Sequence, residues 1–456
     1  MQSINPATEQ IIGEYPDHSQ ETIAAMLAQA CLAFESWRRT PISERAGLMR
    51  NAAKVLRERR DVLARLITSE MGKPITASET EVEKCAACCE FFADNAARFL
   101  APREIKSDAD RSFVRFDPLG PVLAIMPWNF PFWQVFRFAA PTLMAGNVAV
   151  LKHAPNVPGC AMAIERTFLD SGFPPGVFSS LLISDNQIAE QLVSRPEIVA
   201  VTLTGSERAG AAVASAAATA LKKSVMELGG SDAFIVLADA DLESVAQHAA
   251  EARCINNGQS CIAAKRFIVE LSIAEKFESA MSAAMAAMKV GDPMDPQTQI
   301  GPLARPDLLD VLMRQVQRTI EQGATLLTGG HRLPGKGYYF EPTVLSNVEP
   351  KMMAFEEETF GPVAAIIRAQ TVDDAVRLAN LSHYGLGASI WTSNMDRAIA
   401  LAEEIESGSV FINGMVKSDP HLPFGGIKNS GWGRELSEFG IHEFVNIKTV
   451  WAKSVP

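Results

Sequence analysis

The sequence has no apolar run long enough to cross a membrane. Its longest weakly charged stretch, residues 118–151, carries Arg137 as its only formal charge, but Pro127, Pro131 and Pro141 interrupt it. Because a spanning helix needs about 20 consecutive apolar residues, we predict that this stretch is buried core. An isolated guanidinium in apolar surroundings must find an anion or a set of acceptors, which makes Arg137 a candidate functional residue.

Other absences exclude further classes of protein. No basic segment followed by an apolar run opens the chain, so we expect neither a secretory nor a transit signal and a cytoplasmic location. The chain lacks an excess of basic residues, with 42 Lys and Arg against 53 Asp and Glu and a net charge of −11, so a nucleic-acid partner is not expected. The seven cysteines show no repeated spacing, which suits reduced thiols. No metal is expected: the histidines form no ligand spacing, and Cys85, Cys88 and Cys89 have no histidine nearby.

What is present is ample material for a globular core. The chain has 456 residues, 47% of them hydrophobic, and at roughly 100–200 residues per domain this length predicts two to four domains. Apolar residues recur at helical spacing near residues 21–37, 42–70 and 78–100. The polar alternating run 105–116 is typical of an exposed hairpin or edge strand.

From residue 122 short apolar runs alternate with helical stretches. This alternation predicts βαβ units, parallel sheets and two α/β domains. The expected strands are residues 122–126, 147–152, 200–204, 225–228 and 234–237, then 266–270, 363–367, 389–391 and 409–413. An Ala-rich helix is expected at 209–221. The C-terminal run 443–451 alternates again, and we expect it to pair with residues 105–116 or with a neighbouring subunit.

Three local patterns could carry chemistry. Cys261 follows the polar turn Gly258-Gln259-Ser260 ahead of an apolar strand, where a nucleophilic thiolate could be exposed; a buried small hydrophobe is the alternative. Glu227 ends a β-like run before a double glycine, where a carboxylate could activate water or simply cap a strand. Residues 204–210 open the Ala-rich helix after a strand, which favours phosphate binding or an ordinary N-cap, although the GxGxxG fingerprint is absent.

Seven motifs taken together resemble the aldehyde dehydrogenase superfamily over essentially the whole chain. They are Trp128-Asn129-Phe130-Pro131, Lys152, Thr204-Gly205-Ser206, Glu227-Leu228-Gly229-Gly230, Gly258-Gln259-Ser260-Cys261, Glu358-Thr359-Phe360-Gly361-Pro362 and Pro423-Phe424-Gly425-Gly426, in that order. The resemblance implies two Rossmann-type α/β domains and a small β oligomerisation arm, in a homodimer or homotetramer. We expect the NAD(P)-binding domain at 1–100 and 119–228, the catalytic domain at 229–432 and the arm at 101–118 and 433–456.

The resemblance also implies a reaction cycle. Cys261 would attack an aldehyde as thiolate, and the Asn129 amide with the Cys261 N–H would hold the oxyanion of the thiohemiacetal. After hydride transfer to the nicotinamide, Glu227 would activate the water that hydrolyses the thioester. Relatives that transfer the acyl group to coenzyme A generally lack this glutamate, so its presence favours a carboxylic acid as product.

For the cofactor, the resemblance places Lys152 on the adenosine ribose. It places Gly205, Ser206 and Trp128 near the pyrophosphate, and Glu358 with Phe360 at the nicotinamide riboside. NAD-preferring members commonly carry a glutamate where this chain has Pro155, and that glutamate would repel a 2′-phosphate. We therefore predict that NADP is accepted or preferred, with equal use of NAD and NADP as the alternative.

Substrate choice is expected to depend on Arg137 and Ser418, which stand where succinate-semialdehyde dehydrogenases bind the distal carboxylate of their substrate. An internal carboxylate paired with Arg137 is the alternative. The second arginine of that subfamily is Ile255 here, and Lys417 or His421 could supply the missing charge. Ala263 replaces a second cysteine of some relatives, so we predict no redox disulfide there.

The function predicted is therefore oxidation of the small aldehyde succinate semialdehyde to succinate. The alternatives are a dehydrogenase of another short aliphatic, amino or ω-carboxy aldehyde, a cofactor-independent cysteine hydrolase that uses Cys261 and Glu227, and a non-catalytic binding protein on the same fold.

Overall fold

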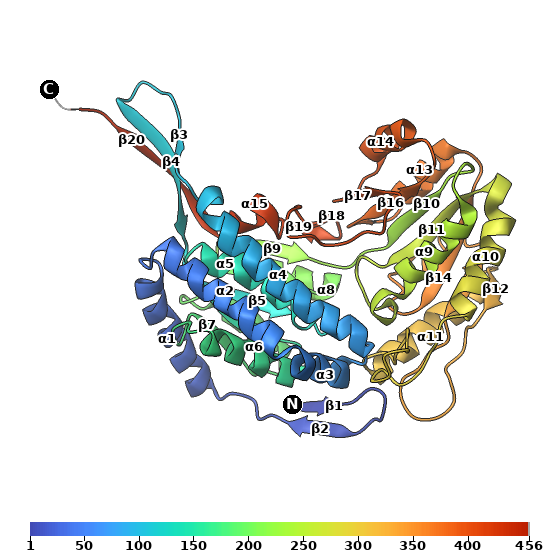
Figure 1. The fold of residues 1–456 in the computed structure, drawn as a ribbon, viewed down its shortest axis with the longest axis horizontal. Helices are drawn as coiled ribbons and strands as arrows, with labels where there is room; N and C mark the ends of the chain where they lie inside the picture. Colours follow the sequence, from blue (N-terminus) through green and yellow to red (C-terminus); the bar gives the residue numbers. More distant parts are fainter. Residues whose placement is uncertain (455–456) are drawn as a thin grey trace.

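The computed structural model describes residues 1–454, and two separate parallel sheets organise them (Figure 1). The first sheet is six-stranded, in the order β19-β9-β8-β5-β6-β7, and only β19 runs antiparallel to its neighbour. Its strands are β5 (Pro121–Met126), β6 (Val148–His153), β7 (Phe178–Leu181), β8 (Ala200–Thr204), β9 (Lys223–Glu227) and β19 (Gly431–Trp432). The four predicted strands are present, and β7 was missed by the sequence prediction.

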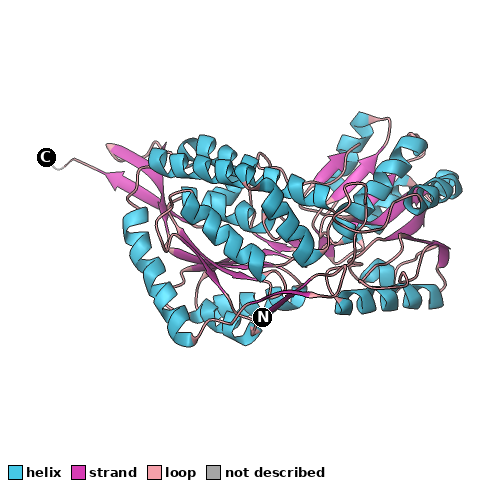
Figure 2. Cartoon of the chain, turned by 60° about the horizontal axis from the view of Figure 1, so that its bottom comes forward, coloured by secondary structure: helices cyan, strands magenta, loops and turns pink. Residues whose placement is uncertain are grey.

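Helices cover both faces of this sheet (Figure 2). They are α1 (Gln20–Trp37), α2 (Ile42–Glu58), α3 (Arg60–Met71), α4 (Ile75–Phe99), α5 (Trp133–Met144), α6 (Pro158–Asp170), α7 (Asn186–Ser194) and α8 (Glu207–Thr219). The single helix expected over residues 42–70 is in fact two, because Arg59 leaves helical geometry with φ −106° and ψ 10°. Apolar positions continue in helical register on both sides of this break, so the sequence pattern did not reveal it.

The second sheet is seven-stranded, in the order β12-β13-β14-β11-β10-β16-β17, with β12 antiparallel to β13 and the others parallel. Its strands are β10 (Asp232–Val236), β11 (Ala264–Glu270), β12 (Thr325–Thr328), β13 (Thr343–Ser346), β14 (Val363–Ala369), β16 (Ala388–Trp391) and β17 (Val410–Ile412). The helices around it are α9 (Leu242–Cys254), α10 (Ala274–Ala286), α11 (Pro306–Glu321), α12 (Met353–Glu356), α13 (Val372–Asn380) and α14 (Met395–Glu404).

The central strands are apolar almost throughout, because helices bury both of their faces. Every residue of β6, β8 and β10 is buried. This continuous burial, rather than an alternating pattern, is typical of parallel sheets. The α/β class predicted from the sequence is confirmed.

An antiparallel ribbon of three strands projects from the body, with the end of β20 at its tip (Figure 1). It consists of β3 (Arg103–Glu104), β4 (Arg111–Pro118) and β20 (Val445–Ala452). Val445 lies opposite Pro118 and Ala452 opposite Arg111, so β20 pairs with β4 of its own chain along its whole length. The predicted pairing with the 105–116 region is thus present, and because β20 is the edge strand of this sheet, pairing with a neighbouring subunit stays a prediction.

The remaining elements are short. They are the pair β1 (Gln2–Ile4) and β2 (Ile11–Glu14), the pair β15 (Tyr384–Gly385) and β18 (Ile427–Lys428), the helix α15 (Ser437–Ile441) and two 3₁₀ turns at Ile255–Gly258 and Leu271–Ile273. Within residues 1–454, no helix has both the length and the hydropathy that a membrane crossing requires. Over the same residues, His, Cys, Asp and Glu side chains form no group of three or more suited to a metal ion.

Candidate active site

A cavity of about 340 Å³ brings together residues from both halves of the chain. It lies at the carboxyl ends of β5, β8 and β9, where open α/β sheets place their ligands. Seven predicted residues line it, namely Trp128, Asn129, Gly205, Ser206, Cys261, Glu358 and Phe360. Glu227, Arg137, Ser418, Lys152 and Pro155 are not part of its lining.

The loop that carries Cys261 is held in an unusual backbone conformation. Asn256 and Asn257 have φ values of 56° and 60°, in the left-handed region that asparagine tolerates better than most residues. The Asn257 amide also donates to two main-chain carbonyls at 3.0 Å. Gly258, with φ +73°, packs so closely that a Cβ there would lie 2.2 Å from the carbonyl carbon of Gly361. The loop therefore requires glycine at position 258.

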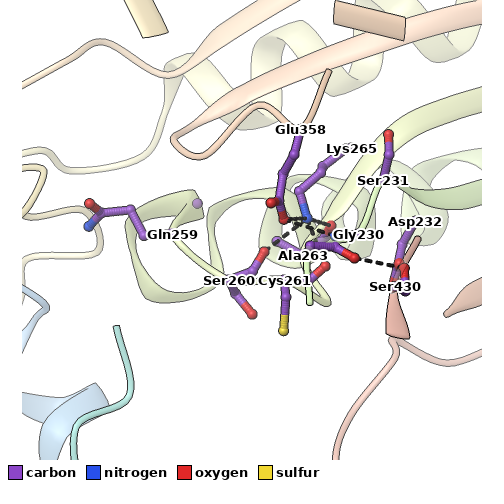
Figure 3. Close-up of polar contacts among 12 residues, drawn as sticks. Gly230, Ser231, Asp232, Gln259, Ser260, Cys261, Ala263, Lys265, Glu358 and Ser430 are labelled. Atoms are coloured by element: carbon purple, nitrogen blue, oxygen red, sulfur yellow. Dashed lines mark hydrogen bonds and ion pairs between the residues drawn. The ribbon is translucent and has the colours of Figure 1, made fainter. Parts of the chain in front are cut away.

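Lys265, which the sequence analysis did not single out, holds this loop from inside the protein. Its side chain is fully buried, and its Nζ donates to the carbonyls of Ser260 at 2.9 Å and Cys261 at 2.7 Å. Glu358 lies 3.3 Å from the same ammonium and accepts from the Gly230 N–H at 3.1 Å. In Figure 3 the Cys261 sulfur points away from this polar cluster. The one signal in the sequence that could have pointed to Lys265 was the presence of a lysine at the start of the apolar strand β11.

Asn129 presents its amide nitrogen to the same loop. Nδ2 donates to the carbonyl of Gln259 at 3.0 Å, and Oδ1 accepts from Gln134 Nε2 at 3.0 Å. Because Gln134 holds the amide oxygen on the opposite side, the donor group faces the nucleophile loop. A preorganised N–H donor beside the reacting sulfur is the arrangement that stabilises a developing oxyanion.

The Cys261 thiol is neutral at rest. Burial raises its pKa to about 12, although Arg137 and Lys265 act in the opposite direction. Attack on a carbonyl therefore requires removal of the thiol proton as the substrate binds.

Glu227 lies at the end of β9, buried with 2% of its surface exposed, directly before the cavity residues Leu228 and Gly229. Burial raises the pKa of its carboxyl group well above the usual range, and the neighbouring Glu435 raises it further, while Arg137 lowers it. Among residues 1–454 its Oε1 has no hydrogen-bond partner. Without a ligand, burial thus favours the protonated form of this carboxyl group, and the ionised form is the one that can act as a base.

Arg137 takes an internal partner. Its guanidinium forms an ion pair with Glu435, stacks on the Phe424 ring at 4.5 Å and donates to Thr204 Oγ1 at 3.4 Å. The structure thereby satisfies the buried charge with an internal carboxylate, the alternative that the sequence left open. Binding of a substrate carboxylate by Arg137 stays a prediction.

Ser418 is buried beside Lys84, a second residue that the sequence analysis missed. Its Oγ accepts from Trp133 Nε1 at 2.9 Å and from Lys84 Nζ at 2.8 Å. The proposed alternative cations differ from Lys84 in their surroundings: His421 pairs with Asp419 at 2.7 Å, and Lys417 is exposed.

The opposite end of the site suits a dinucleotide. Gly205 and Ser206 line the cavity at the N-terminus of α8, and a Cβ at Gly205 would meet only Leu203 within 4 Å, so the backbone can approach a phosphate. The Trp128 and Phe360 rings meet edge to face at 5.8 Å. Lys152 is buried with Asn186 Oδ1 at 3.5 Å.

Next to the exposed Pro155, both amide atoms of Asn156 are buried without a hydrogen-bond partner among residues 1–454. An orphaned amide near a buried ammonium is the kind of polar pair that a ribose or a phosphate would satisfy. These residues therefore fit a nicotinamide dinucleotide.

Comparison with known proteins identifies the family. Residues 1–450 match the aldehyde dehydrogenase family. The chain belongs to the aldehyde dehydrogenase family. Among curated members, it is 53% identical to a probable succinate-semialdehyde dehydrogenase [NADP(+)] of Synechocystis, covering 98% of this chain and 99% of the relative. It is 49% identical to the Escherichia coli succinate semialdehyde dehydrogenase [NAD(P)+], covering 98% and 97%.

The same family provides the similar solved structures. The succinic semialdehyde dehydrogenase of Streptococcus pyogenes, determined in complex with NADP+, superposes with a TM-score of 0.97 at 37% identity and covers 99% of this chain and 100% of that one. This agreement confirms the aldehyde dehydrogenase fold that the motifs predicted.

Proposed function

We propose that this aldehyde dehydrogenase oxidises succinate semialdehyde to succinate and uses NADP as hydride acceptor, with NAD as a second acceptor. The observation that carries the proposal is the shared cavity, in which the Cys261 thiol and the Asn129 amide meet the residues that fit a dinucleotide. The names of the Synechocystis, E. coli and S. pyogenes relatives support the substrate and the cofactor.

The residues of the chain support each step of the reaction. Cys261 Sγ forms a bond to the aldehyde carbon, and the Asn129 Nδ2 and Cys261 N–H groups bind the oxygen that becomes negative. The nicotinamide, when bound, accepts the hydride that this carbon releases. The carbon is then a thioester on Cys261. Glu227, once ionised, takes a proton from water as the water attacks, and Cys261 leaves as thiolate with succinate as product.

Three features support NADP. Pro155 carries no charge that would repel a 2′-phosphate. Lys152, near the end of β6, offers an ammonium, and Asn156, in the connection from β6 to α6, offers an unsatisfied amide. The curated relatives above carry NADP(+) or NAD(P)+ in their names.

Location, assembly and domain limits complete the proposal. We infer a cytoplasmic homodimer or homotetramer in which residues 101–118 and 433–456 form the oligomerisation arm. The support for the arm is the projecting ribbon of β3, β4 and β20, whose Ile447 and Trp451 side chains are 62% and 50% exposed. Light scattering of the purified protein tests the assembly, and cell fractionation tests the location.

Initial rates of NADPH and NADH formation, measured in parallel with succinate semialdehyde and butanal, test the proposed reaction. We expect the highest kcat/KM with succinate semialdehyde and NADP. A preference for butanal with both cofactors would overturn the carboxylate assignment. A constant absorbance with every aldehyde would overturn the assignment as a dehydrogenase. It would favour a cofactor-independent hydrolase, which turns over esters but forms no NADPH.

A further inference from the structure

A lysine on α4 lies beside the serine that the sequence placed at the distal end of the substrate. Lys84 Nζ is 2.8 Å from Ser418 Oγ and 4.0 Å from the centroid of the Trp133 ring. Trp133 Nε1 donates to the same oxygen at 2.9 Å. Ser418 Oγ therefore accepts from two donors and still has its own proton to donate, and the Lys84 ammonium has two further N–H groups.

Lys84 is the cation in this region that lacks an anionic partner. The titratable groups that face its ammonium are Glu81, Cys85 and Cys88 on α4 and Arg137 on α5. Glu81 is already occupied, because it pairs with Lys73 and accepts the N–H groups of Phe132 and Trp133 at 2.8 and 2.9 Å.

The remaining charged neighbour is itself neutralised, since Arg137 pairs with Glu435. Burial raises the pKa of Cys88 to about 12 and that of Cys85 well above its usual range, so neither thiol provides a negative charge. Within residues 1–454, Lys84 is thus a partly buried ammonium without an ion pair.

This ammonium is connected to the nucleophile through α5. Trp133 contacts Lys84 and Ser418, while the next residue, Gln134, lines the cavity and holds Asn129. Arg137, one turn further along α5, lies within electrostatic range of both Lys84 and Cys261. Because Trp133 and Gln134 are adjacent on α5, this helix joins the Lys84–Ser418 contact to the cavity that contains Cys261.

We propose that Lys84, together with the Ser418 hydroxyl, binds the distal carboxylate of an ω-carboxy aldehyde, and that it is the main determinant of selectivity for a charged over a neutral aldehyde. The inference rests on the proposed function. It also assigns Arg137 a different task, because a guanidinium paired with Glu435 contributes a field at the site and not a free bidentate ligand.

The proposal has a pH signature. Burial, with a smaller effect of Arg137, lowers the pKa of the Lys84 ammonium to about 8. The group is charged below that pH and loses its charge above it, whereas the substrate carboxylate stays ionised throughout. The ratio of kcat/KM for succinate semialdehyde to that for butanal should therefore fall as pH rises through 8. The ratio cancels steps common to both aldehydes, such as thiol ionisation.

The test compares succinate semialdehyde with butanal, its uncharged analogue of equal chain length, in the wild-type enzyme, Lys84→Met and Lys84→Arg. We expect Lys84→Met to lower kcat/KM for succinate semialdehyde about 10–100-fold, mostly through KM, because a charge-assisted hydrogen bond is lost. Butanal should change less than about threefold. Lys84→Arg should keep most of the selectivity and remove the pH dependence near 8. Lys54→Met, which removes an exposed ammonium on α2, controls for net charge.

Each of the following outcomes would overturn either the inference about Lys84 or the proposed function. Equal losses with both aldehydes in Lys84→Met would make Lys84 a structural residue and overturn the inference. A selective loss in Lys417→Met or His421→Ala, with none in Lys84→Met, would assign the carboxylate to a rival cation. A wild-type enzyme inactive with succinate semialdehyde would overturn the proposed function, a result distinct from an active wild type that Lys84→Met leaves unchanged. If Lys84→Met does not fold, a wild-type ratio that is constant from pH 7 to 9.5 overturns the inference.

Discussion

The two ends of the substrate site are built on opposite principles. At the nucleophile, side-chain donors and main-chain carbonyls satisfy one another: Asn129 donates to the Gln259 carbonyl and accepts from Gln134, and Lys265 donates to the carbonyls of Ser260 and Cys261. At the distal end, not every buried charged side chain is paired with a side chain of opposite charge.

That distal end contains the buried pair of Arg137 and Glu435, and Lys84, which has no ion pair among residues 1–454, beside Ser418. The reaction at the aldehyde carbon is the same for every substrate, and fixed dipoles suit it because reorganisation of the site during the reaction would slow it. Recognition of an anion needs a charge that the protein itself leaves unpaired. Changes at the first end should therefore affect all aldehydes alike, and changes at the second should affect stability, pH response and selectivity.

The largest effect is expected at the nucleophile. Cys261→Ser removes the only thiol in the cavity lining and should lower kcat by about 10⁴-fold or more with both succinate semialdehyde and butanal. NADPH formation measures the loss, and circular dichroism checks that the fold is kept. Cys254→Ser, a buried change outside the cavity, serves as the matched control. Residual turnover above a hundredth of the wild-type value would place the nucleophile elsewhere.

A large effect on stability is expected at the distal end. Arg137→Met leaves Glu435 buried without its cation, which should reduce the free energy of unfolding by about 3–5 kcal/mol. Urea denaturation at pH 7 measures the change. The double variant Arg137→Met/Glu435→Gln removes the charge on both partners and should recover most of the loss. If the single and double variants unfold at the same urea concentration, the ion pair does not contribute as described.

Asn129→Ala tests the fixed dipole. Removing one oxyanion donor should lower kcat about 10²–10³-fold, equally for the charged and the neutral aldehyde, since the donor binds only the reacting oxygen. Steady-state kinetics with both substrates measures this. Asn129→Asp has nearly the same shape but lacks the N–H donor, so it should lose as much activity as the alanine variant. A loss confined to succinate semialdehyde would break the contrast between the two ends.

The smallest effect is the response of the thiol to pH. Burial raises the pKa of Cys261 to about 12, so the thiolate is a minor species whose fraction rises about tenfold for each pH unit between 7 and 9. The rate of alkylation by iodoacetamide, followed by mass spectrometry of the Cys261 peptide, should rise by the same factor. Arg137→Met should slow the reaction at every pH, because it removes a positive charge that lowers this pKa. A plateau below pH 8 would contradict the raised pKa of this thiol.

The success of sequence-based prediction differed between local and distant features. Strand β8 was placed residue for residue, and Cys261, Asn129, Gly205 and Glu358, which motifs of a few residues each predicted for one site, line a single cavity. Such motifs fix a turn or a strand end, and the parallel sheet then carries each to the same edge. The break at Arg59 and the strand β7 were missed, because the local apolar pattern continues through the first and is too short to stand out in the second.

The distal end was the least predictable part of the site. The sequence offered Lys417 and His421 as replacement cations because they lie near Ser418 in the chain. The structure instead brings Lys84 to Ser418, across 334 positions of sequence. No periodicity marks this lysine, since it lies on a helix whose spacing is explained by packing alone.

By itself, the sequence determined the α/β architecture and the family, and it predicted the nucleophile, because these depend on short patterns whose geometry is set within a few residues. Only the tertiary structure decided which buried charges meet: Arg137 with Glu435, Lys265 with the nucleophile loop and Lys84 with Ser418. The physical reason is that electrostatic partners are chosen by distance and desolvation in space, and both arise from how distant helices and loops pack.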